Sequence, residues 1–118
     1  MSLRKTGILA YTVNKNNNDS KDCADKVRDA VKDEFIERLS EKNSLYEAID
    51  VEHHDTLFVL NVPSLYDIQK IKNLIVRIFR DIYQEVANKQ GYDYDKKQIT
   101  IYYLLSIDNE VKQYRLSL

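Results

Sequence analysis

Residues 64–90, SLYDIQKIKNLIVRIFRDIYQEVANKQ, form the stretch that decides how the rest of the chain is interpreted. Their apolar side chains recur every three or four residues, which is the spacing of one face of an α-helix. This stripe consists of Leu65, Ile68, Ile71, Leu74, Ile75, Ile78, Phe79, Ile82 and Val86. The pattern predicts one amphipathic helix over residues 64–90, about 40 Å long at about 1.5 Å per residue.

Capping residues mark both ends of this predicted helix. Ser64 follows Pro63, and its hydroxyl is placed to accept a hydrogen bond from the amide of Asp67. Lys89 near the last carbonyls and Gly91, which tolerates the left-handed conformation, mark the C-terminal end. Because the face opposite the stripe is polar, the helix is not a membrane span.

The amino-acid composition limits the class of protein to which the chain can belong. The 118 residues are 43% hydrophobic and 31% charged, which is typical of a single globular domain over residues 1–118. With a net charge of -1, the chain has no overall positive charge that would attract nucleic acid or an anionic membrane. The single cysteine, Cys23, excludes an internal disulfide framework and favours a reducing, cytoplasmic location. Two glycines in the whole chain argue against glycine-built nucleotide loops, so we expect no cofactor.

The remaining segments predict strands and one further helix. Residues 7–13 (GILAYTV) are nearly all apolar and indicate a central strand. A second amphipathic helix is expected over residues 20–41, with its stripe formed by Ala24, Val27, Val31, Phe35 and Leu39. Two hairpins are expected, one from residues 46–52 and 56–62, the other from residues 98–107 and 111–118.

Each predicted hairpin has a register that gathers apolar residues on one face. In the first, a turn at residues 53–55 pairs Val51 with Phe58. In the second, Asp108 and Asn109 suit a two-residue turn because both tolerate positive φ. That turn pairs Ile107–Glu110, Leu105–Lys112, Tyr103–Tyr114 and Ile101–Leu116.

The resulting order, β-α-β-β-α-β-β, predicts an α+β fold. Its simplest solution is a two-layer ferredoxin-like sandwich, an antiparallel sheet with both helices on one face. Right-handed crossovers give the strand order 5-4-1-3-2. The other sheet face then has no helix, yet its centre is apolar and its rim polar, as in an interface. The predicted interface residues are Ile8, Ala10, Leu57, Val59, Tyr102, Leu104 and Arg115.

Residues capable of catalysis or metal binding are sparse. His53, His54 and Asp55 form the only ligand-like cluster, but neighbouring residues of an extended chain point to opposite sides. A polar hairpin tip is the preferred interpretation, with no metal bound. Cys23 lies beside the apolar stripe of its helix and is interpreted as a core residue, so no catalytic residue is predicted.

The sequence therefore favours a small intracellular, non-catalytic interaction or regulatory module. We expect it to associate with a second copy or another protein through the uncovered sheet face. The alternative is a nucleic-acid-associated protein, either a single-strand binder or a metal-dependent nuclease. RNA-recognition motifs share the β-α-β-β-α-β order, but residues 56–62 (TLFVLNV) lack a basic-Gly-aromatic pattern. Nucleic acid is therefore possible but not the favoured partner.

Overall fold

The protein is an α+β structure with one sheet and two long helices. The computed structural model describes residues 4–42, 50–54, 57–91 and 97–118. The elements are β1 (Arg4–Lys15), η1 (Asn18–Ser20), α1 (Lys21–Lys42), β2 (Asp50–His54), β3 (Leu57–Pro63), α2 (Ile68–Gln90), β4 (Ile99–Ile107) and β5 (Glu110–Ser117). All five strands pair antiparallel in the order β2-β3-β1-β4-β5, which is the predicted order read from the other edge.

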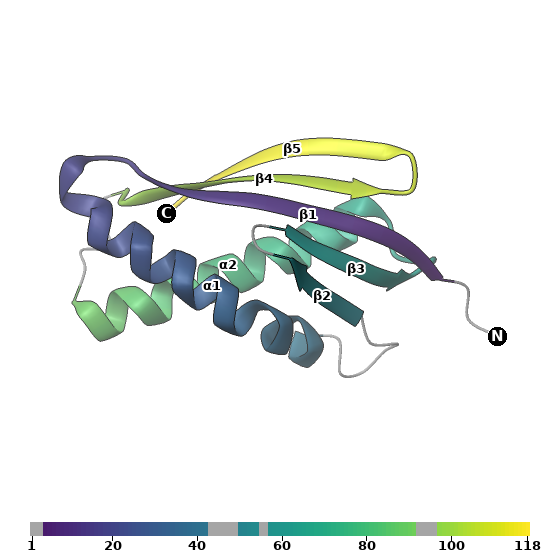
Figure 1. The fold of residues 1–118 in the computed structure, drawn as a ribbon, viewed down its shortest axis with the longest axis horizontal. Coiled ribbons are helices and arrows are strands. Elements are labelled where there is room, and N and C mark those ends of the chain that lie inside the picture. Colours follow the sequence, from purple (N-terminus) through teal and green to yellow (C-terminus); the bar gives the residue numbers. More distant parts are fainter. Residues whose placement is uncertain (1–3, 43–49, 55–56, 92–96) are drawn as a thin grey trace.

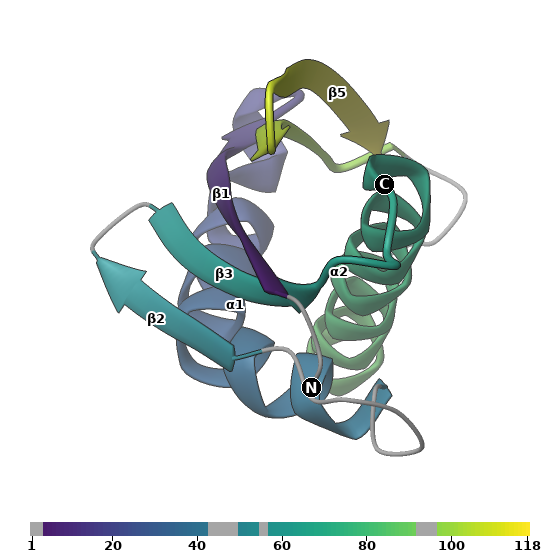
Figure 2. The ribbon, with the colours of Figure 1, turned by 90° about the vertical axis from the view of Figure 1, so that its right-hand side faces the viewer.

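Both helices cover the same side of the sheet (Figure 1). Figure 2, turned by 90°, shows the sheet twisting from β2 to β5, as antiparallel sheets do. The sheet side that faces the helices carries alternate residues of β1, β3 and β4, all buried: Leu9, Tyr11, Val13, Phe58, Leu60, Val62, Ile99, Ile101, Tyr103, Leu105 and Ile107. The predicted stripe of α1 is buried as well. Strand residues that recur with a period of two and helix residues that recur with a period of 3.6 thus pack against each other in one core.

Aromatic rings form the centre of that core. Phe58 stacks on Phe35 of α1 at 4.5 Å between ring centroids, and on Tyr11 of β1 at 5.5 Å. Phe79 of α2 lies 5.7 Å from Phe35 and 5.6 Å from Tyr103. Because ring pairs at these separations attract one another beyond simple area burial, this cluster joins the two helices to three strands.

The long helix starts later than the sequence predicts. Asp67, not Ser64, is the N-cap, and its carboxylate accepts from the Lys70 amide at 2.8 Å. The preceding residues form a turn in which the Tyr66 amide donates to the Pro63 carbonyl. Leu65, assigned to the stripe, is therefore 96% exposed. The C-terminal end is as predicted, with Gly91 in the left-handed region at φ 73°.

The first hairpin is extended further than predicted. His53 and His54 belong to β2 and lie opposite Phe58 and Leu57, so the predicted turn at residues 53–55 is wrong. Val51 pairs with Leu60 instead of Phe58, a register shift of two residues. A shift of two keeps every residue on its face, so the apolar pattern could not distinguish the two registers. The predicted strand residues 46–49 and Asp55 lie outside the described residues.

The second hairpin has the predicted register throughout. All four predicted pairs are observed, and Asp108 takes a φ of 56° in the two-residue turn. Beyond β5, Ile99 and Leu118 exchange two backbone hydrogen bonds of 3.0 Å.

A polar cluster closes the end of the sheet where β1 leads into α1. The Asn16 amide donates to the Gln98 carbonyl at 3.0 Å, and Thr100 Oγ1 donates to Asn16 Oδ1 at 2.7 Å. The fully buried Ser20 hydroxyl lies 2.8 Å from the side-chain oxygen of Gln98. These contacts fix the start of α1 against the start of β4, because buried polar groups remain stable only when they are hydrogen-bonded.

Candidate functional site

The sheet side opposite the helices gathers all seven predicted interface residues. The ladder places Ala10 between Leu57 and Leu104, and Ile8 opposite Val59. Tyr102 lies between Thr12 and Arg115. We call this surface the open face and define it as Ile8, Ala10, Thr12, Leu57, Val59, Tyr102, Leu104, Ser106, Val111, Gln113 and Arg115, together with the β2 positions Asp50, Glu52 and His54, which the ladder places opposite Asn61, Val59 and Leu57. Whether it is an interface stays a prediction.

Exposed apolar side chains concentrate on the open face. Of the five large hydrophobic side chains exposed in the described parts, three lie here: Ile8 at 42%, Tyr102 at 46% and Val111 at 61%. Ile8 and Val111 lie in one row across the sheet, with Ser106 between them. Val59 lies beside Ile8 in the same row, and Leu57 and Leu104 flank Ala10 in the next row; all three are half-buried. A contiguous apolar patch is therefore presented to solvent.

The open face is hollowed near its centre. Ala10, Thr12, Tyr102, Leu104 and Gln113 contribute to a shallow depression of about 430 Å³. The short side chain of Ala10 lies between two leucines, which leaves room above it. Such a hollow suits an inserted side chain of a partner, since packing at the core of an interface matches that of a protein interior.

Charged residues on this surface lie on its two edge strands. Arg115 belongs to β5, and the ladder places Asp50 and Glu52 of β2 opposite Asn61 and Val59. A surface that follows a nucleic-acid backbone needs several cations arranged along it. The open face thus has an apolar centre and a polar edge, with no basic stripe among its defined residues.

The predicted ligand-like cluster is described only in part. His53 and His54 occupy successive positions of β2, and Asp55 lies outside the described residues. No group of three or more His, Cys, Asp or Glu side chains suited to a metal occurs among residues 4–42, 50–54, 57–91 and 97–118.

Cys23 is a core residue, as predicted. Its side chain is 1% exposed, and burial, followed by the charge of Asp22, raises the pKa of its thiol to about 11. A thiol with so high a pKa is protonated at neutral pH and is a poor nucleophile.

This pKa predicts an alkaline loss of stability. The unfolded thiol ionises near its ordinary pKa of 9.0, whereas the folded thiol ionises only near 11. The folded state therefore binds the proton more tightly, and the thiol's contribution, complete below pH 9, is lost as the pH rises towards 11. Urea unfolding of the native protein and of Cys23→Ala should show a stability difference that changes over this pH range. A difference that stays constant from pH 7 to pH 11 would contradict the prediction.

Two features of the structure could not be predicted from the sequence. One is the polar cluster around Ser20 and Gln98, whose members are 78 residues apart in the chain. The other is a groove between β1 and α1, where Arg28 reaches the Val13 carbonyl. Both depend on contacts between distant segments, which local periodicity does not report.

Comparisons with protein-family models, curated proteins and solved structures yield no match. No helix in the described residues is both long and apolar enough to cross a membrane.

Proposed function

We propose that the protein is a small, non-catalytic intracellular interaction module that forms a homodimer through the open face. The observation that carries the proposal is the concentration of exposed apolar side chains, Ile8, Tyr102 and Val111, on the one sheet side without helices. Burying such side chains against a partner removes apolar area from water, which is the main favourable term in association.

The size of the open face supports a stable association. Strands about 4.8 Å apart and about seven residues long give the five-stranded sheet a flat area of roughly 24 by 23 Å. Two such faces stacked together bury roughly 1,100 Å² in total, above the ~1,000 Å² that separates specific interfaces from incidental contacts. Stacked sheets of this kind pack about 10 Å apart with their side chains interdigitated.

A second copy is the partner that the chemistry favours. A twofold interface places one surface against itself, so the surface must be self-complementary. A face with an apolar centre meets this requirement, because its charged residues, Arg115 on β5 and Asp50 and Glu52 on β2, lie on the two edge strands and no like charges are buried at its centre. Single-stranded nucleic acid is not favoured, since Arg115 is the sole cation among the open-face residues.

We also infer that the fold is a ferredoxin-like sandwich with β5 added to one edge. The support is the observed order β2-β3-β1-β4-β5, in which the first four strands in the chain have the ferredoxin-like arrangement. This arrangement alone carries no function.

Thiol accessibility tests the proposed dimer. A cysteine introduced at the exposed open-face residue Thr12 should react with a maleimide in proportion to the fraction of monomer, so its rate falls as protein concentration rises. Leu65→Cys is the matched control, because Leu65 is 96% exposed and lies outside the open face. Cys23 contributes little, being buried with a raised pKa. Equal concentration dependence at both positions would overturn the proposal.

A further inference from the structure

The central strand β1 is longer than its neighbour β3. Pairing with β3 ends at Ala10 opposite Leu57, whereas pairing with β4 continues to Lys15 opposite Ile99. From Val13 to Lys15, β1 therefore has β4 on one side and no paired strand among the described residues on the other. Figure 1 shows this end of β1 extending past β2 and β3, with α1 beneath it.

The backbone groups on this side of β1 can be assigned. The Asn16 amide donates to the Gln98 carbonyl, so Asn16 directs its peptide groups towards the line of β4. Along an antiparallel strand the direction alternates from one residue to the next. Val13 and Lys15 therefore direct their N–H and C=O groups away from β4, towards the uncovered edge.

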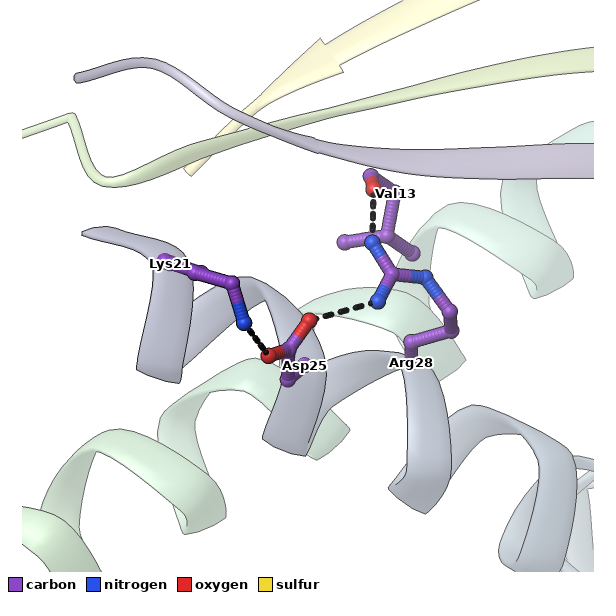
Figure 3. A network of polar contacts seen from close by, with 4 residues as sticks. All are labelled: Val13, Lys21, Asp25 and Arg28. Carbon is purple, nitrogen blue, oxygen red and sulfur yellow. Dashed lines mark hydrogen bonds and ion pairs between the residues drawn. The ribbon is translucent and has the colours of Figure 1, made fainter. Parts of the chain in front are cut away.

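Arg28 of α1 satisfies one of these groups. Its Nη2 donates to the Val13 carbonyl at 2.7 Å, which independently confirms the direction of that carbonyl. Its Nη1 donates to Asp25 at 2.8 Å, and Asp25 also pairs with Lys21 at 2.9 Å (Figure 3). The guanidinium thus takes the place that the amide of a neighbouring strand would occupy, and protects the edge as charged side chains often do.

A groove runs along this edge on both sides of Arg28, with charged side chains of α1 in its lining. One hollow of about 520 Å³ is lined by Tyr11, Thr12, Val13, Asn14, Arg28, Asp29 and Lys32. The other, of about 440 Å³, is lined by Val13, Asn14, Lys15, Lys21, Ala24, Asp25 and Arg28. Val13, Asn14 and Arg28 line both hollows, so the two adjoin each other at these residues. Four cations against two carboxylates give the lining a net charge of +2.

We propose that this groove binds an extended acidic peptide segment, which adds to β1 as a strand in line with β3. The open N–H and C=O groups of Lys15 and the N–H of Val13 pair with the peptide backbone, as in strand addition. The peptide's amide replaces Arg28 at the Val13 carbonyl, and its carboxylates lie near Lys15, Lys32 and the released guanidinium. The groove shares only Thr12 with the open face and is otherwise formed by the β1 edge and α1, so this proposal does not rest on the dimer.

Fluorescence anisotropy with a labelled peptide of alternating Val and Glu tests the proposal. Saturable binding is expected, with at least about a tenfold loss when Glu is replaced by Gln, because ion pairs in the groove are lost. A similar loss is expected for a peptide N-methylated on alternate residues, which keeps its charge but loses the donors on one edge. Binding that is insensitive to N-methylation, or no binding, would overturn strand addition.

Protein variants provide the complementary test. Lys15→Pro removes an amide that faces the groove and leaves the hydrogen bonds to β4 intact, so affinity should fall by about tenfold. Lys15→Ala is the matched control, because it removes the same charge but keeps the amide, and its affinity for the peptide should fall less than that of Lys15→Pro. Lys32→Glu changes an exposed residue of α1, where it cannot disturb the sheet, and should also weaken binding severalfold. Unchanged affinity in both Lys15→Pro and Lys32→Glu would contradict the proposal.

Discussion

Phe58→Ala is expected to lower the free energy of unfolding by about 4 kcal/mol, the largest effect of any single core truncation considered. Phe58 is fully buried on β3 and stacks on Phe35 of α1 and Tyr11 of β1 at the same time. Truncation removes both ring pairs and leaves a cavity that α1, held at its other contacts, cannot fill. Urea unfolding at a fixed protein concentration measures the change.

Leu65→Ala is the matched control for this prediction. Leu65 is also a large apolar residue, but it is 96% exposed, so its removal should change stability by less than about 0.5 kcal/mol. If both substitutions have equal effects, the aromatic cluster is not the centre of the core.

Ala10→Lys is expected to weaken the proposed dimer by at least about 100-fold, or about 2.7 kcal/mol. Ala10 lies at the centre of the open face, between Leu57 and Leu104, and lines the hollow that a partner side chain would fill. A lysine there removes the hollow and places an unpaired charge in an apolar interface, which costs several kcal/mol. Light scattering coupled to size-exclusion chromatography measures the oligomeric state.

The monomer should tolerate Ala10→Lys. In the isolated chain the position faces solvent, and a lysine can extend its ammonium into water while its stem covers Leu57 and Leu104. Far-ultraviolet circular dichroism and thermal unfolding should therefore remain close to those of the unsubstituted protein. Leu65→Lys introduces the same charge outside the open face and should leave the dimer intact.

The second hairpin shows what the sequence predicts well. The inward positions of β4 are all apolar, Tyr114 and Leu116 continue that face on β5, and Asp108–Asn109 fix the loop length, so one register satisfies both conditions. The inner stripe of α2 follows from periodicity in the same way, from Ile68 to Ile82.

Other features depend on competition between similar signals. Ser64 and Asp67 are both acceptable N-caps. Because Asp67 caps the helix, Tyr66 lies in the core at 5% exposure and Leu65 is exposed to solvent. In the first hairpin two registers give the same faces, so no local pattern separates Val51–Leu60 from Val51–Phe58. Packing over the whole molecule decides which N-cap and which register form.

The open face and the groove differ in how far the sequence reveals them. The open face follows from strand alternation, because each residue's face is set by its position relative to the core residues. The groove follows from the difference in length between β1 and β3 and from the reach of Arg28 to Val13. Neither the position of a strand end nor a contact between a helix and a strand can be predicted from a local sequence pattern.

Sedimentation equilibrium of the unsubstituted protein beside Ala10→Lys, from low to high micromolar concentration, tests the central claim most directly. The account predicts that the unsubstituted protein approaches twice the chain mass as concentration rises, while Ala10→Lys remains at the mass of one chain. A monomer at every concentration, or an Ala10→Lys protein that dimerises as tightly as the original, would contradict association through the open face.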